Sequence, residues 1–362
     1  MIQEKYREYG SLLFEVVDAI EPLDGQAVAA ARERLDRLTK PLGSLGRLED
    51  LVAQLAGITR SPIPDMTRKA IVIMCADNGV VTERVAQVGS EITASVTRNF
   101  TKGLTAVNVF SKLVNAELAI VNIGVQEEID CASVLNRRVR NGTSNITKGP
   151  AMSEHEVLQC IETGIEVVSS LKKNGIQVLG TGEMGIGNTT TSSAIIAVLL
   201  RESVNKVVGR GAGLSDDGLK RKCDAIERAI TVNCPDRDDP IDVLRKLGGF
   251  DIAGLVGCYL GAAAHRIPIL IDGFISATAA LIADRITCQS KQYMIPSHFS
   301  SEPGTAKVFE ALALSPYLRL DMRVGEGTGS ALGFFVVDAA IAAYTGMGTF
   351  DDANIEQYQK QN

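Results

Sequence analysis

The fold is decided by residues 174–200, whose sequence is NGIQVLGTGEMGIGNTTTSSAIIAVLL. An apolar run at 176–179 is followed by four glycines between 180 and 187, then by hydroxyl side chains at 189–193 and an apolar segment. This order predicts a strand, a glycine-rich loop and a helix. Glycines let a backbone approach an anion closely, and the free N–H groups and dipole of a helix start favour a phosphate. The stretch therefore predicts a phosphate cradle.

Two better-known phosphate-binding patterns are absent from this stretch. It matches neither G-x-x-x-x-G-K-[ST] nor G-x-G-x-x-G followed by an acidic residue, so it does not support an ATPase or a dinucleotide-binding protein. A glycine-rich turn without a ligand occurs in many parallel-sheet proteins and is the plain alternative. Glu183 favours the interpretation with a bound ligand, because a carboxylate in an anion-binding loop would repel the anion unless it had a partner of its own. A ribose hydroxyl, from which it accepts a hydrogen bond, would be such a partner.

Composition limits the classes of protein to be considered. With 362 residues, 45% hydrophobic and 22% charged, the chain can bury one large core and have a smaller second domain. The net charge of −6 is spread without a long basic run, so we expect no nucleic-acid partner. Seven cysteines without C-x-x-C spacing favour reduced thiols and a cytoplasmic location. The charged N-terminus and the lack of a twenty-residue apolar run predict neither a signal peptide nor a membrane span.

From residue 69 onward, apolar strand patterns alternate with helical ones, which is typical of a parallel sheet. The predicted strands are 69–77, 116–124, 176–180, 267–273 and 292–298. The expected fold class is α/β, with a three-layer Rossmann-like catalytic domain and a mostly parallel sheet over 67–348. A small helical segment or domain at 1–66 precedes it, and a C-terminal tail at 349–362 follows it.

Helical spacing and capping residues predict the connecting segments. The predicted helices cover 26–38, 45–55 with Ser44 as N-cap, 90–102, 104–114, 153–173, a helix that follows Ser215 and runs through 222, and 330–344. Residues 137–150 are polar without periodicity and predict a binding or interface loop. Residues 39–46 suit a plain interhelical turn or, because Lys40 is surplus to such a turn, a segment near the ligand.

The predicted strands end in polar or glycine-bearing loops, which should meet at one crevice because ligands of open α/β sheets lie beyond the carboxyl ends of the strands. Asp77 and Asp272 each follow a strand, where a turn cap is as good an explanation as a functional role. Basic residues 220–222 suit a solvated helix face, or one of them turns toward an anion. Glu326 stands between two glycines before an apolar helix, an arrangement that suits a general base whose pKa burial can raise.

Six motifs in order, TKPLGSLGRLE, GTGEMGIGNTTT, GRGAG, LIDGF, HFSSEPG and RVGEGTGSA, resemble the nicotinate-nucleotide:dimethylbenzimidazole phosphoribosyltransferase family of cobamide synthesis. The resemblance runs from about residue 39 to 344. It implies transfer of ribose 5-phosphate from nicotinate mononucleotide to a cobamide lower-ligand base, with the β-glycosidic bond inverted to α. It implies no metal and no cofactor, and a homodimer or a heterodimer with a paralogous subunit.

The resemblance also implies roles for particular residues. Glu326 would be the catalytic general base. The nucleotide and phosphate would be bound by Glu183, Gly185, Gly187, Asn188, Thr189, Gly211, Lys222, Ser300 and Gly325. The acceptor base would be bound by Asn78, Val88, Ser90, Met184 and Val324. For Lys222, the resemblance outweighs the solvated-face interpretation.

The chain departs from the family pattern near the acceptor. The family usually has Asp-His-Gly after the first strand, whereas this chain has Asn78 in place of the histidine. Gly89 and Ser90 stand where the family usually has Pro-Gln, and Thr305 stands where it usually has a histidine. Because these changes remove polar groups, they predict a pocket that also accepts phenol or another non-benzimidazole base, as some relatives with paired unlike subunits do. A nucleotide-binding subunit without catalysis and a purely structural α/β protein are the remaining alternatives; the intact Glu326 and the six ordered motifs argue against them.

Overall fold

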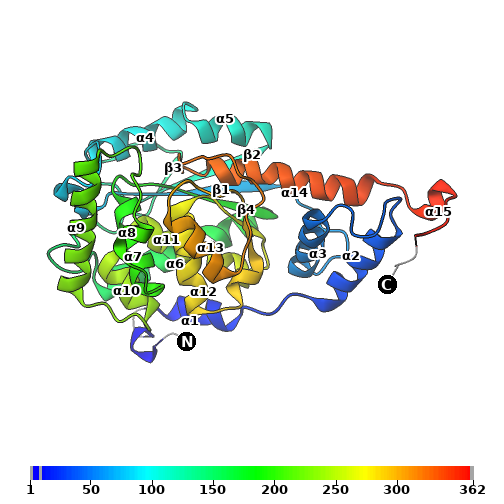
Figure 1. Cartoon of the computed structure of the whole chain (residues 1–362), viewed down its shortest axis with the longest axis horizontal. Coiled ribbons are helices and arrows are strands. Elements are labelled where there is room, and N and C mark those ends of the chain that lie inside the picture. Colours follow the sequence, from blue (N-terminus) through cyan, green and yellow to red (C-terminus); the bar gives the residue numbers. More distant parts are fainter. Residues whose placement is uncertain (1–2, 8–9, 359–362) are drawn as a thin grey trace.

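The computed structural model describes residues 3–7 and 10–358 (Figure 1). Its centre is a six-stranded parallel sheet with the order β3-β2-β1-β4-β5-β6. The strands are β1 (Lys69–Ala76), β2 (Ala116–Gly124), β3 (Val134–Asn136), β4 (Val178–Met184), β5 (Ile269–Ile271) and β6 (Met294–Pro296). The chain moves to one edge after β1 and returns to add β4 on the other side of β1. The carboxyl ends of β1 and β4 therefore flank the point where the strand order reverses, which is where ligands of such sheets bind.

The predicted α/β Rossmann-like fold is confirmed, with differences in the strands. Strands β5 and β6 are shorter than the predicted 267–273 and 292–298. The short edge strand β3 was missed, because three residues give too little periodicity to be recognised. Strand β4 continues to Met184, beyond the predicted end at residue 180. Glu183 therefore lies on a strand and not in the loop, so the prediction of a carboxylate within the loop was wrong.

The helices connect and cover these strands. They are α1 (Ser11–Asp18), α2 (Gly25–Arg37), α3 (Arg47–Thr59), α4 (Glu91–Lys102), α5 (Ala106–Leu113), α6 (Glu154–Lys173), α7 (Asn188–Leu199), α8 (Val204–Val207), α9 (Asp216–Asn233), α10 (Pro240–Leu247), α11 (Phe250–Ala264), α12 (Phe274–Ile286), α13 (Gly304–Leu312), α14 (Thr328–Gly346) and α15 (Phe350–Ala353). Short 3₁₀ turns lie at Glu4–Tyr6, Gly79–Glu83 and Ser290–Tyr293. The predicted N-cap of α9, Ser215, is confirmed by its side-chain hydrogen bond. Ser153, predicted as the first residue of a helix, is the N-cap of α6. Ser44 was a wrong N-cap, because α3 begins after Gly46.

The sheet is the middle of three layers. Alternate residues of β1 enter opposite cores, as the strand period requires: Val72 and Met74 pack on one side, and Ile71 and Ile73 on the other. Helices α11 and α12 cover the first face, with α6 packed on α11, while α4, α5 and α14 cover the second. Both faces are buried, as is usual for a parallel sheet.

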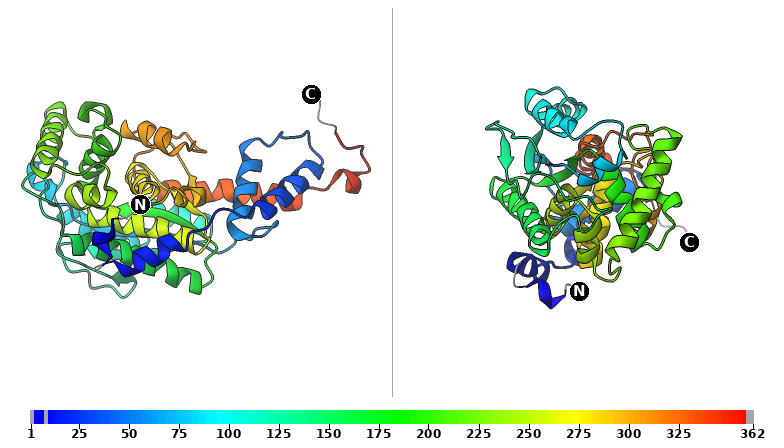
Figure 2. Two further views of the ribbon diagram at one scale, coloured as in Figure 1. Left: turned by 90° about the horizontal axis from the view of Figure 1, so that it is seen from below. Right: turned by 90° about the vertical axis from the view of Figure 1, so that its left-hand side faces the viewer.

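Helices α2 and α3 lie beside the far part of α14, to one side of the sheet (Figure 2). Helix α1 instead packs against α6 and α11. The boundaries 1–66, 67–348 and 349–362 stay a prediction. By length and composition α14 is apolar enough to cross a membrane, but it packs against β4, β5 and α3, and its Asp338 pairs with Lys69 at 3.0 Å. It is therefore a helix of the protein core.

Candidate active site

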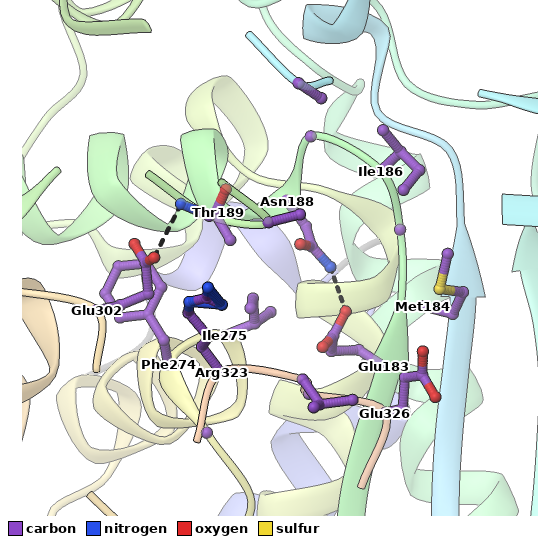
Figure 3. Close-up of a pocket in the computed structure, with 18 of the residues that line it drawn as sticks. Glu183, Met184, Ile186, Asn188, Thr189, Phe274, Ile275, Glu302, Arg323 and Glu326 are labelled. Atoms are coloured by element: carbon purple, nitrogen blue, oxygen red, sulfur yellow. Dashed lines mark hydrogen bonds between the residues drawn. The ribbon is translucent and has the colours of Figure 1, made fainter. Parts of the chain in front are cut away.

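A pocket of about 310 Å³ opens at the carboxyl ends of β4 and β5. Its lining comes from β4, the loop into α7, the loop before α9, the segments after β5 and β6, the loop before α14, and α4 with residues 85–88 before it. Figure 3 shows Glu326 and Thr189 on opposite sides of this pocket, with Glu183 between Asn188 and Glu326. The pocket thus brings the two most distinctive motifs of the sequence, GEMGIGNTT and GEGTG, to one place.

Most of the predicted site residues line this pocket. They are Glu183, Met184, Gly185, Gly187, Asn188, Thr189, Gly211, Ser300, Val324, Gly325, Glu326 and Val88. Lys222 lies directly behind Thr189. Asn78 and Ser90 do not line the pocket, and Thr305 is buried in the first turn of α13.

The acceptor side has a different lining from the one predicted. Asn78 is fully buried, and its side-chain oxygen lies beside the Asp251 carboxylate against Gly249. Ser90 precedes α4 without making a side-chain cap. Helix α4 instead contributes Ile92 and Val96 to the pocket wall. Sequence reasoning missed these two residues, although their i, i+4 spacing places them on one face of the helix.

The glycine-rich loop forms the predicted helix start. Gly187 is the N-cap of α7 with φ 93°, in the left-handed region that favours glycine, and a Cβ there would lie 2.8 Å from a methyl group of Val81. Thr189 follows in the first turn, with its side chain at the pocket. The N-terminus of α7 therefore opens onto the pocket, where its N–H groups and dipole favour an anion.

Lys222 supplies a buried cation next to this helix start. Its side chain is 0% exposed, and its Nζ donates to Thr189 Oγ1 at 2.8 Å and to the Gly209 carbonyl at 3.0 Å. Burial lowers the pKa of Lys222 to about 8, and the nearby Glu302 carboxylate opposes that shift. Lys220 and Arg221 are exposed, so one of the three consecutive basic residues turns inward, as the family resemblance implied for Lys222.

Glu326 is held by a strained loop. Its φ is 63°, a left-handed conformation that is unfavourable by roughly 1–3 kcal/mol for a residue other than glycine. The Asp272 carboxylate accepts backbone N–H groups from Gly327 at 3.1 Å, Gly329 at 2.6 Å and Ser330 at 3.1 Å, and so ties the loop to the end of β5. Burial and, to a smaller extent, the charge of Asp272 raise the pKa of Glu326 to about 7. A carboxyl group with such a pKa suits proton transfer near neutral pH.

Glu183 faces the pocket from β4. The Asn188 side-chain nitrogen donates to Glu183 and, at 2.9 Å, to Asp251. Burial, followed by the negative charge of Asp251, raises the pKa of Glu183 to about 8. A Cβ on Gly325 would collide with Glu183, so this glycine allows the GEGTG loop to approach the strand.

Several further polar residues of the pocket were not singled out by the sequence. Arg323 points into it (Figure 3), Arg210 and His298 line it, and Glu302 accepts the Gly211 N–H at 2.9 Å. All of them lie within the quoted motifs. The polar and charged residues of those motifs could therefore have been predicted to line the pocket. Lys40 does not reach the pocket; it pairs with Glu49 at 2.8 Å, which favours the interhelical-turn interpretation of residues 39–46.

Comparison with known proteins agrees with this geometry. The family model described as phosphoribosyltransferase matches residues 20–355. The chain belongs to this family. A relative from Ruminiclostridium cellulolyticum named nicotinate-nucleotide--dimethylbenzimidazole phosphoribosyltransferase is 56% identical over 95% of this chain and 98% of its own length. A relative of the same name from Acetivibrio thermocellus is 55% identical over 97% of this chain and 100% of its own length.

Solved structures agree as well. The crystal structure of CobT from Thermus thermophilus superposes with a TM-score of 0.88 at 36% identity, covering 92% of this chain and 100% of that one. The family and the fold together show that the chain is a phosphoribosyltransferase, an enzyme of the glycosyltransferase type.

Proposed function

We propose that this protein transfers the phosphoribosyl group of nicotinate mononucleotide to dimethylbenzimidazole, giving an α-ribotide and nicotinate. The observation that carries the proposal is the pocket itself, which has the α7 helix start and Lys222 on one side and a single loop-borne carboxylate, Glu326, on the other. The names of the most similar relatives support the same donor and acceptor.

In this proposal the donor lies with its phosphate at the start of α7. The N–H groups there, with the charges of Lys222 and Arg323, compensate the phosphate charge. The ribose lies next to Glu183. The leaving nicotinate carries a pyridinium charge that is neutralised as the glycosidic bond breaks, so its departure needs little assistance from the protein.

The acceptor requires the catalytic help. A benzimidazole attacks the anomeric carbon through one ring nitrogen and loses the proton on the other nitrogen, and Glu326 takes that proton. Such general-base assistance contributes about 10²- to 10⁴-fold to the rate. Ile92, Val96 and Met184 form an apolar wall suited to an aromatic ring. No divalent ion enters the scheme, because the donor has no pyrophosphate whose charge it would neutralise.

We further propose that the enzyme acts in the cytoplasm without a cofactor, as a homodimer or with a paralogous subunit. The free cysteines at all seven positions are compatible with a reducing compartment.

The choice of acceptor is tested by competition. Purified protein is given nicotinate mononucleotide with equal amounts of dimethylbenzimidazole, adenine and phenol, and the products are identified by mass. We expect the dimethylbenzimidazole product to dominate, since the named relatives favour that base. A phenolic product in excess would instead favour the phenolic acceptor expected from the sequence, although Asn78, Ser90 and Thr305 do not line the pocket. No ribotide from any acceptor would refute the proposed reaction.

Lys222→Met should weaken nicotinate mononucleotide binding by at least ~10-fold, because it removes one charge-assisted contact at the phosphate end. The KM for the acceptor should stay nearly unchanged. Initial-rate kinetics with each substrate varied in turn will measure both constants. Lys220→Met, in the same helix but exposed, is the matched control and should behave as the unmodified enzyme. Equal donor affinity in both variants would place the phosphate elsewhere.

A further inference from the structure

Asp251 is a buried acid with no function in the reaction described so far. It lies in the first turn of α11, is 0% exposed, and does not line the pocket. Within the described residues it forms no ion pair with a lysine, arginine or histidine. The rest of α11 is apolar and buried, so an apolar residue would be the simpler choice at this position. Its place at the start of α11 stabilises the negative charge, so its remaining contacts decide whether it has a further role.

Its contacts connect it to the pocket. Asp251 Oδ2 accepts from the side-chain nitrogen of Asn188 at 2.9 Å, and the same nitrogen donates to Glu183. The two hydrogens of one amide group are therefore divided between two buried carboxyl groups. Asn188 and Glu183 both line the pocket, and Figure 3 shows the Asn188 nitrogen directed at Glu183.

This arrangement leaves Asn188 a single orientation. An amide has its two donors on nitrogen and its acceptors on oxygen, and here the nitrogen donates to both carboxyl groups, which places the oxygen on the side away from them. Rotation of the amide by half a turn would place its oxygen against both of them. With Asp251 removed, one of the two contacts that select the orientation is lost, and Glu183 loses a firmly held partner.

Gly185 shows that the backbone accommodates this contact. A Cβ on Gly185 would lie 2.5 Å from Asp251 Oδ2 and 2.6 Å from the carbonyl oxygen of Ala76. The glycine-rich loop therefore passes closely over Asp251 on its way to α7. The carboxylate of α11, the loop and the pocket-facing amide form one packed unit.

We propose that Asp251 is a positioning residue of the active site, which acts through the Asn188 amide to hold the Glu183 carboxyl group toward the ribose of the donor. The inference rests on the proposed function, because it assigns the Glu183 side of the pocket to the nucleotide. Asp251 itself touches neither substrate. Its loss should therefore affect the binding of the donor and leave the binding of the acceptor base unchanged.

The central test is a comparison of two substitutions at one position. Asp251→Ala should raise the KM for nicotinate mononucleotide by at least ~10-fold, corresponding to the loss of a buried hydrogen-bonded contact. The KM for dimethylbenzimidazole should stay within about 2-fold of the original. Asp251→Asn should restore the donor KM to within about 3-fold, because its carbonyl oxygen still accepts from Asn188. A loss of general stability would not separate the two substrates in this way.

A double-mutant cycle tests whether Asp251 acts through Glu183. The effect of Asp251→Ala on the donor KM should largely disappear in a Glu183→Gln background, since coupled residues are not additive. Full additivity would overturn the proposal. So would an unchanged donor KM in Asp251→Ala, or an equal rise for both substrates. If the alanine variant does not fold, Asp251→Leu, which fills the volume in an apolar helix, is measured in its place.

Asp242→Ala is the matched control. Asp242 is also a buried acid in the first turn of a helix, α10, but it pairs with Arg245 and Lys246 and not with the pocket. We expect lower thermal stability and an unaltered donor KM. The unmodified enzyme is assayed in parallel. If it does not consume nicotinate mononucleotide, the proposed function is refuted. If it does, and Asp251→Ala has the same donor KM, only this inference is refuted.

Discussion

Glu326→Gln is expected to lower turnover by about 10²- to 10⁴-fold, while nicotinate mononucleotide still binds with nearly its original affinity. Glutamine keeps the shape of the side chain and accepts the same left-handed backbone as poorly as glutamate does, so the loop should stay in place. It cannot take a proton from the acceptor base. The loss should therefore appear in kcat, measured by single-turnover and steady-state kinetics, with donor affinity followed by calorimetry.

The pH dependence of turnover is a second readout for the same residue. A general base must be ionised, and the pKa of Glu326 is raised to about 7 by burial and by the charge of Asp272. Turnover of the unmodified enzyme should therefore fall as the pH drops below about 7, and this acidic limb should be absent from the residual activity of Glu326→Gln.

Asp321→Asn is the control for Glu326→Gln. Asp321 belongs to the same loop and also has a positive φ, of 53°, but it is exposed and does not line the pocket. Its substitution should leave turnover and the pH profile unchanged. Turnover of Glu326→Gln equal to that of this control would remove Glu326 from the role of base.

The sequence was sufficient for the fold class and for the two loops that face each other across the pocket. Strand and helix periods, glycine positions and the ordered motifs are local properties, so they predicted the sheet, the α7 helix start and the place of Glu326 in a loop between two glycines before α14. The end of β4 was misjudged, because the glycines at 180 and 182 lower strand propensity although the strand continues through them. A Cβ on Gly182 would lie 2.7 Å from the Gly327 nitrogen, so that glycine serves a long-range contact.

Long-range contacts also explain why the sequence could not tell the roles of Asp77 and Asp272 apart. Asp77 and Asp272 have the same local setting, each at the end of a buried strand, and a cap or a function was equally acceptable for both. The structure gives them different partners. Asp77 accepts the Gln126 N–H at 2.8 Å beyond β2, whereas Asp272 holds the loop that bears Glu326. Similarly, the sequence gives no local sign of the contact between Asp251 and Asn188, since that contact depends on how α7 and α11 lie.

Asp272→Asn should lower turnover by about 10²-fold, because Asp272, which also lines the pocket, holds the loop that carries Glu326. The carboxylate accepts three backbone N–H groups, from Gly327, Gly329 and Ser330. Asparagine has only one acceptor oxygen, and its NH₂ group would face a backbone donor. At least one charge-assisted hydrogen bond is lost, which destabilises the folded state by about 1.5–3 kcal/mol. The loop then no longer fixes Glu326, and a displacement of about 1 Å is enough for a 10²-fold loss of rate.

Asp77→Asn is the matched control, since it makes the same chemical change directly after β1, as Asp272→Asn does directly after β5. Asparagine there can still accept the Gln126 N–H, so we expect a loss of no more than about 1 kcal/mol in the free energy of unfolding and turnover within a few-fold of the original. Denaturant unfolding and steady-state kinetics on both variants decide the matter. If both lose stability and activity in proportion, Asp272 is only a structural cap; if Asp272→Asn alone loses turnover at a temperature where both are folded, the aspartate at the end of β5 is what keeps the base in its working position.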